Sequence, residues 1–196
     1  TNVAGETQAS TYSLGVGNRS MLLGAEIQNP VCKEDSIKLT FKATNLDGQP
    51  VSVEGNYKLY PVVGGAKSEE VMKGTPAYTG TFVSNKETLL PGWTSVPSGE
   101  YLLVMSAKDD QGREVTGEEE VILFSIKDKR PPVDKAIWYY AENTSFDAAH
   151  PAVFYFGTSK KDAYVMMNLF SGNRMLESKV LRLSDSIERF ESVSYT

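Results

Sequence analysis

Apolar and polar residues alternate with a period of two along most of this sequence. The clearest run is 35–43, in which Ile37, Leu39 and Phe41 are separated by polar residues. In an extended strand, this alternation sends one set of side chains to a core and the other to water, as in a half-buried antiparallel sheet. No long segment shows the 3.6-residue period of a helix. The chain is therefore predicted to be all-β.

Short stretches rich in turn-forming residues separate the predicted strands. The segment 45–50 contains Asn, Asp, Gly and Pro and is a predicted turn. Further strands are predicted at 51–63, 101–107, 115–126, 136–140, 152–156, 163–170 and 175–183. One irregular strand is expected at 80–84 or 87–90, and one short helical turn at 184–190, behind an N-cap-like serine. Many short strands joined by turns are typical of β-sandwiches.

Length and charge limit the classes of function. The 196 residues are enough for one large domain or two small ones. A net charge of -5 disfavours binding to nucleic acid or to an anionic membrane surface. No run reaches the roughly 18 apolar residues of a membrane span, so none is predicted in this fragment. Without an initiator Met or a signal peptide, the sequence is expected to be part of a longer chain.

An internal repeat suggests how the chain is divided. The segment 2–7 matches 109–114, so Asn2 corresponds to Asp109 at an offset of 107 residues. Such a period fits tandem sandwich modules of about 100 residues. The predicted units are terminal strands of a preceding unit at 1–17, a complete sandwich at 18–128, a linker at 129–135, and a second, incomplete sandwich at 136–196.

Three stretches resemble one known family. They are Asn45-x-x-Gly48-x-Pro50-Val51 followed by Tyr57-x-Leu59, Gly99-x-Tyr101-x-Leu103 followed by Ala107-x-Asp109-x-x-Gly112, and Phe156-Gly157-Thr158-Ser159 followed by Asp162-x-Tyr164-Val165. In this order they resemble the macroglobulin (MG) domains of bacterial α2-macroglobulin-like proteins.

The resemblance implies tandem antiparallel β-sandwiches of fibronectin III-like type. It also implies a structural part of a large periplasmic, cell-surface or extracellular protein that entraps proteases as an endopeptidase inhibitor. Neighbouring MG domains, and proteases, would be its partners. The family's thioester needs Cys-x-x-Gln, but Cys32 is followed by Lys33, Glu34 and Asp35, so no thioester is expected at this cysteine. The stretch 64–99 is either a bait-like loop or, as we favour, an irregular strand with its turns.

The acidic stretch 107–124 is the strongest candidate for a metal site. An EF-hand loop that began at Asp109 would place Gly112 at its fourth position and Arg113 at its fifth, which does not fit the ligand spacing. Adjacent Asp109 and Asp110 in an exposed turn also give no cleft and no reason for split pKa values. Asp with Gly between two strands is, in contrast, a well-known hairpin signal. The stretch, with Glu114 at its far side, is predicted to be a hairpin.

Two further groups of residues are candidate binding surfaces. The run 118–120 is three glutamates, expected on a solvated or edge strand, with a site for a basic partner as the alternative. Aromatic alternation places Tyr139, Phe154 and Phe156 on one side of a sheet and Trp138, Tyr140 and Tyr155 on the other. Core packing or an inter-domain contact is the favoured interpretation. The alternative is sugar stacking in a carbohydrate-binding or adhesin-like module of a cell-surface protein.

Catalysis is not predicted for this chain. It has one cysteine, Cys32, and one histidine, His150, which excludes Cys/His zinc sites within one chain. His150 precedes Pro151 and is expected in a loop, and no nucleophile-elbow motif is present. We therefore expect no catalytic residue, no cofactor and no metal ligand. A strand-swapped dimer, in which 1–17 completes the second unit, is one way to pair its open edges.

Overall fold

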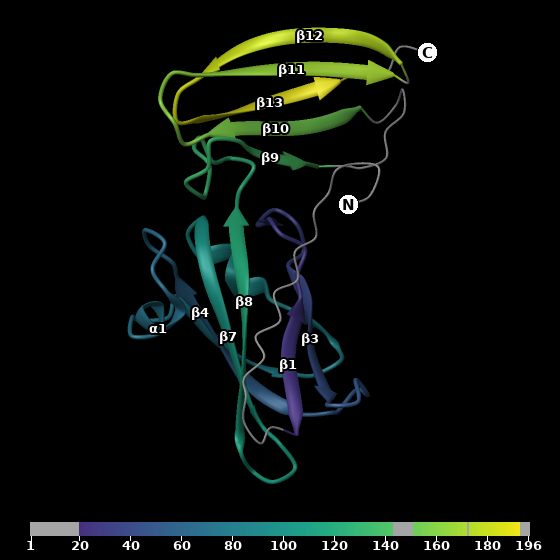
Figure 1. Cartoon of the computed structure of the whole chain (residues 1–196), viewed down its shortest axis with the longest axis vertical. Coiled ribbons are helices and arrows are strands. Elements are labelled where there is room, and N and C mark those ends of the chain that lie inside the picture. Colours follow the sequence, from purple (N-terminus) through teal and green to yellow (C-terminus); the bar gives the residue numbers. More distant parts are fainter. Residues whose placement is uncertain (1–19, 143–150, 172, 193–196) are drawn as a thin grey trace.

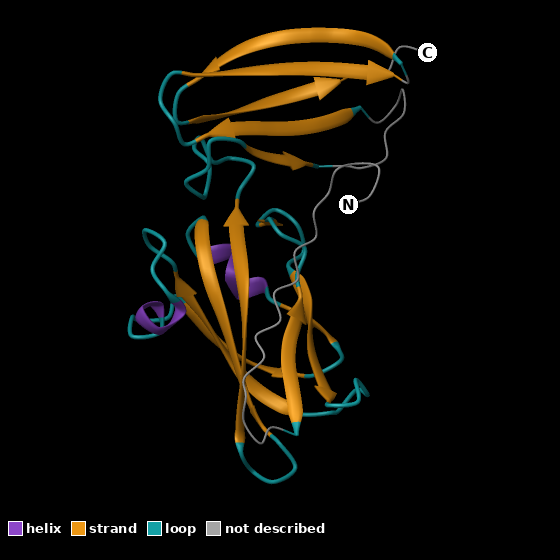
Figure 2. Cartoon of the chain, in the orientation of Figure 1, coloured by secondary structure: helices purple, strands orange, loops and turns teal. Residues whose placement is uncertain are grey.

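Strands dominate the chain, as predicted. The computed structural model describes residues 20–142, 151–171 and 173–192 (Figure 1). His150 and the segment 1–17 lie outside these residues. Besides strands and loops (Figure 2), these described residues contain the short helix α1 (Ser68–Val71) and the 3-10 helix η1 (Pro91–Ser95). No helix in the described ranges is long and apolar enough to cross a membrane. The all-β prediction is confirmed.

Two sheets face each other in the first unit, which we define as residues 20–128. The smaller sheet has the order β1 (Met21–Glu26), β3 (Lys38–Asn45) and β6 (Glu87–Leu89). The larger has the order β2 (Val31–Cys32), β8 (Glu114–Phe124), β7 (Gly99–Lys108), β4 (Glu54–Pro61) and β5 (Tyr78–Val83). All neighbours are antiparallel except β2 and β8.

Aromatic rings from both sheets fill the core of the first unit. Phe41 of β3 stacks on Tyr57 of β4 and Phe82 of β5, with ring centroids 5.2 and 4.3 Å apart. Trp93 of η1 is fully buried and meets Tyr57 edge-on. The stretch 64–99 thus contains a strand at each of the two predicted places, β5 and β6. The 3-10 helix η1, in the same stretch, closes the core.

The second unit, residues 129–192, repeats part of this plan. Its sheets are β13 (Ser186–Ser192), β10 (Ala152–Thr158) and β9 (Trp138–Ala141) in that order, and β11 (Ala163–Ser171) with β12 (Arg174–Leu183). The three-stranded sheet corresponds to β1-β3-β6, and the hairpin corresponds to β4–β5. Strands equivalent to β7 and β8 do not occur in the described part of this unit. The exact domain boundaries stay predictions.

The prediction of a short helical turn at 184–190 is wrong. Asp185 adopts a positive φ of 48° in the turn after β12, and the chain continues as β13. Residues 186–192 pair with β10 along its whole length, for example Phe190 with Phe154. Serine and aspartate favour tight turns as much as helix starts. The open edge of β10 therefore decides the conformation.

Candidate functional site

Buried side chains join the two units end to end. This junction cluster consists of Cys32, Ile122, Phe124, Val133, Trp138, Val153 and Tyr155. Figure 1 shows β8 running from the first unit towards β9 and β10. At its end, Phe124 is fully buried, and its ring lies 5.2 Å from Trp138 and 4.5 Å from Tyr140 in edge-on geometry. The last residue of β8 thus packs among residues of the second unit.

The aromatic alternation predicted from the sequence is confirmed. Trp138 and Tyr155 are each 5% exposed at the junction, with Tyr140 half-buried beside them. Tyr139, on the opposite face, is 61% exposed, and Phe156 on that face contacts Phe190. The interpretation as an inter-domain contact therefore holds for Trp138, Tyr140 and Tyr155. Trp138 is not available to stack on a sugar.

The carboxylate of Glu34 holds the end of β8 on the first unit's side of the junction. It accepts hydrogen bonds from Ser125 Oγ at 2.5 Å, from the backbone N–H of Ile126 at 3.1 Å and from Cys32 Sγ at 3.4 Å. Burial acts to raise the pKa of Glu34, but these three donors more than offset it and the pKa is lowered. The carboxylate therefore fixes the turn that leaves β8.

Cys32 is a packing residue rather than a nucleophile. Its side chain is buried, and this burial, together with the nearby Asp35 and Glu34 carboxylates, raises its pKa to about 11. A thiol in this state stays protonated near neutral pH, and the thiolate is the form that attacks or binds metals. Burial also raises the pKa of Tyr140, whose hydroxyl lies 3.4 Å from an Asp35 oxygen.

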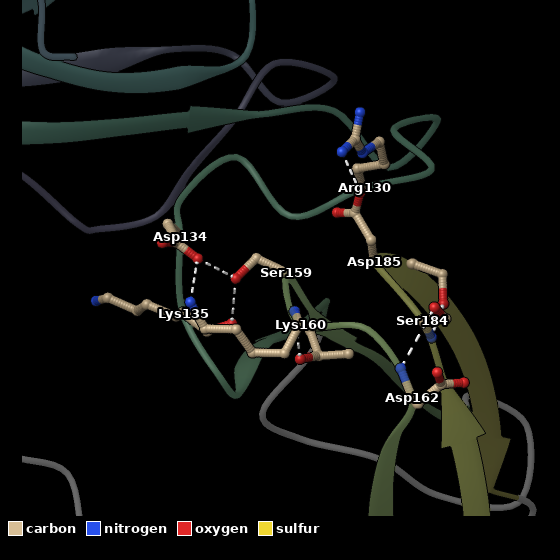
Figure 3. Close-up of polar contacts among 10 residues, drawn as sticks. Arg130, Asp134, Lys135, Ser159, Lys160, Asp162, Ser184 and Asp185 are labelled. Atoms are coloured by element: carbon tan, nitrogen blue, oxygen red, sulfur yellow. Dashed lines mark hydrogen bonds and ion pairs between the residues drawn. The ribbon is translucent and has the colours of Figure 1, made fainter. Parts of the chain in front are cut away.

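Residues 129–135 are fastened to the turns that follow β10 and β12 (Figure 3). They also border a cleft of about 590 Å3. Asp134 accepts hydrogen bonds from Ser159 and Lys160, the latter at 2.6 Å, and Arg130 pairs with Asp185. The cleft is lined by Ser98, Asp128, Lys129, Arg130, Pro131, Pro132, Val133, Asp134, Ser159 and Asp185. Exposed ion pairs add little stability, about 0–1 kcal/mol each. They pair the charges of Arg130, Asp134 and Asp185 at the cleft.

The acidic stretch forms the predicted hairpin. The N–H of Asp109 bonds to the carbonyl of Arg113 at 2.9 Å, and Gly112 has a φ of 75°. The expectation of an exposed turn with ordinary carboxylates is, however, wrong for Asp109, whose side chain is only 1% exposed. Its partners include the Arg113 guanidinium at 2.9 Å and Ser20 Oγ, also at 2.9 Å.

These contacts set the charge state of Asp109. Burial alone would raise its pKa, but hydrogen bonds from the Arg113 and Gln111 backbone, from Ser20 and from the guanidinium lower it to about 2. The carboxylate is therefore fully used in fixing the turn. Across the described residues, no three His, Cys, Asp or Glu side chains are placed to hold a metal ion.

The three glutamates of β8 point to alternate faces, as the sequence indicated. Glu118 and Glu120 lie on the outer face of the five-stranded sheet, opposite Val104 and Leu102 of β7. Glu119 points the other way, towards β1. Burial raises its pKa, and a hydrogen bond from the backbone of Ala25 partly offsets this.

Comparison with known proteins finds a likeness in structure but none in sequence. No protein-family model matches the sequence, and no curated protein matches it. Among solved structures, a chain of E. coli alpha-2-macroglobulin in its native conformation matches with a TM-score of 0.39 and 13% sequence identity. The match covers 88% of this chain and 14% of that chain. The all-β assignment rests on the strands described above.

Proposed function

We propose that this chain is a non-catalytic structural part of an extracytoplasmic protein of the α2-macroglobulin type, which entraps proteases. The observation that carries the proposal is one strand order repeated in two units that are joined end to end through buried aromatic rings. Such a junction suits a module that holds its neighbours at a fixed angle. The chain would act as scaffold, while cleavage and capture would involve other parts of the protein.

The residues that resemble MG domains have structural tasks here. Gly48 and Gly112 occupy tight turns with φ values of 78° and 75°, which glycine adopts without steric cost. Leu59 and Leu103 are fully buried on neighbouring strands, and Tyr57 is 3% exposed. The motif therefore marks the turns and core positions of a sandwich, which supports a structural role for the stretches that carry it.

Polar groups that could serve chemistry are engaged in internal contacts. The carboxylates of Asp109 and Glu34 each accept several hydrogen bonds, and Cys32 is a buried, protonated thiol. Asp134 is paired with Lys160 beside the cleft, and these contacts lower its pKa. This arrangement favours a structural rather than a catalytic role.

The test uses the full-length natural protein and an active protease. After limited digestion we expect the protein to be cut, to change its sedimentation coefficient, and to retain the protease in the same peak. An inactivated protease is the control and should remain free. Cleavage without retention or change of shape would contradict the proposal.

The carbohydrate alternative makes a different prediction for this chain. A sugar-binding module should be retarded in a polysaccharide gel, and Tyr139→Ala should release it, because Tyr139 is the exposed member of the β9 aromatics. Trp138→Phe is the control, since that ring is buried at the junction. We expect no retardation with either variant or with the natural chain.

A further inference from the structure

The turn that follows β8 is compact and is tied to the first unit. The N–H of Asp128 donates to the carbonyl of Ser125 at 3.0 Å, which closes the turn. The Asp128 carboxylate in return accepts a hydrogen bond from the N–H of Ser125 at 2.8 Å. Glu34 of the first unit accepts hydrogen bonds from Ser125 Oγ and from the N–H of Ile126. Residues 125–128 are therefore held as one piece on the first unit.

The backbone after this turn is tied to the second unit. The carbonyl of Lys129 accepts a hydrogen bond from the N–H of Ile187 in β13 at 3.0 Å. The carbonyl of Lys135 accepts one from the N–H of Ser159, also at 3.0 Å. Residues 129–135 are thus fixed at both of their ends to the sheet that contains β10 and β13.

The change from one set of hydrogen bonds to the other falls between Asp128 and Lys129. Rotation about the backbone torsions at this place would turn one unit relative to the other and leave both sets of hydrogen bonds intact. Hinges of this kind consist of a few residues between rigid elements, which absorb the whole change of backbone torsion. The geometry therefore defines a hinge that is one peptide unit long.

The loop 32–35 of the first unit reaches across this hinge. Cys32 packs in the junction cluster, and Glu34 holds the turn that precedes the hinge. Asp35 accepts a hydrogen bond from the hydroxyl of Tyr140 in β9, at 3.4 Å. We call this loop the junction clamp, because its side chains contact both units.

The junction clamp is attached to its own unit by few backbone contacts. It follows β2, which pairs with β8 only through Val31 and Cys32. One further hydrogen bond, from the N–H of Lys33 to the last carbonyl of β8 at 2.9 Å, extends this pairing. Glu34 and Asp35 are exposed beyond it. Edge segments with few backbone hydrogen bonds and little buried surface open at low cost in free energy.

We propose that the junction clamp locks the hinge at Asp128–Lys129, and that its opening lets the two units rotate relative to each other. Glu34 is the positioning residue of the clamp. Its carboxylate holds the turn before the hinge, and it accepts the hydrogen bond of Cys32 Sγ at the base of the loop. This inference goes beyond the proposed function and does not depend on it, because it rests on contacts within this chain.

Pulsed electron resonance on the whole chain tests the proposal. Spin labels at Glu70→Cys and Lys161→Cys, both exposed, report the distance between the units, while the buried Cys32 stays unlabelled. Glu34→Ala removes the acceptor of both hydrogen bonds to the turn. A hydrogen bond to a charged group changes an equilibrium by a factor of about ten or more, so the population outside the main distance peak should rise at least about tenfold.

Two further variants separate clamping from a general loss of structure. Glu34→Gln keeps a side-chain oxygen that accepts hydrogen bonds, so it should broaden the distances less than Glu34→Ala does. Glu87→Ala removes an exposed glutamate that is paired with Lys38 elsewhere on the first unit, and it should leave the distances unchanged. The urea transition of Trp93 should stay in place in each variant, because the core of the first unit is not altered.

Tyr140→Phe supplies a second readout, since it removes only the hydroxyl that reaches Asp35. It should broaden the distances in the natural background and add nothing to Glu34→Ala, in which the clamp is already open. An unchanged distance distribution in Glu34→Ala would overturn the proposal. So would a broad distribution that appears only with loss of the Trp93 transition, or an equal effect of Tyr140→Phe in both backgrounds.

Discussion

Truncation of Phe124 should weaken the junction without unfolding the first unit. Phe124 is fully buried and contacts Trp138 and Tyr140, yet it belongs to the junction cluster rather than to the core of the first unit. Phe→Ala at a buried site costs about 3–5 kcal/mol. Each edge-on aromatic contact adds about 0.5–1.5 kcal/mol beyond the buried area. We therefore expect Phe124→Ala to cost about 4 kcal/mol, all of it at the junction.

The chain has two tryptophans, and they report on the two regions separately. Trp93 is fully buried in the core of the first unit, and Trp138 lies in the junction cluster. In urea titrations of single-tryptophan variants, Phe124→Ala should shift or abolish the Trp138 transition and move the Trp93 transition by less than about 1 kcal/mol.

Phe41→Ala is the matched control, because Phe41 is equally buried but lies in the core of the first unit. It should shift both transitions, since the junction cluster is built on the end of β8. The reasoning would be refuted if Phe124→Ala left the Trp138 transition in place. An equal shift of both tryptophan transitions by Phe124→Ala would refute it as well.

Three further changes have defined outcomes. The folded pKa of Asp109, about 2, lies below its ordinary value of 3.8, so its stabilising effect is present above about pH 4 and is lost as the pH falls towards 2. Asp109→Asn should lower the melting temperature at neutral pH, and the melting temperature of this variant should fall less between about pH 4 and pH 2. If Asp110→Asn flattened this pH dependence instead, the assignment of the effect to Asp109 would be contradicted. Cys32, with its pKa raised to about 11, should resist a thiol reagent at neutral pH and react fully once the chain is denatured; rapid labelling of the folded chain would be inconsistent with its burial. Gly117→Ala should destabilise the first unit by about 1–3 kcal/mol, because a Cβ there would lie 2.4 Å from a backbone oxygen of β1. Gly99→Ala, whose Cβ would meet only a tyrosine ring edge at 3.6 Å, is its control, and equal melting temperatures for the two variants would count against the close contact.

Periodicity predicted most strands because each carries its own burial pattern. In β3, Leu39 and Phe41 are buried while Lys38 and Lys42 remain accessible, as the alternation requires. The same logic separated Trp138 from Tyr139 across β9. Local sequence was enough in these cases, because a strand with one buried face has only one register that hides its apolar residues.

Contacts between distant residues could not be read in the same way. Asp109 seemed exposed because its turn is polar, but Ser20, 89 residues away, helps to cover it. Glu34 accepts a hydrogen bond from Ser125, 91 residues away, and no sequence motif at either residue predicts this contact. The strand at 186–192 likewise depends on the free edge of β10. In each case the deciding partner is set by topology rather than by neighbouring sequence.

The structural role proposed for this chain requires a fixed arrangement of its two units. Spin labels at Glu70→Cys and Lys161→Cys, both exposed, would report the distance between the units by pulsed electron resonance, while the buried Cys32 stays unlabelled. We expect one narrow distance distribution in the natural background and a broad one with Phe124→Ala. A broad distribution in the natural background would contradict a rigid junction, and with it the structural role proposed for this chain.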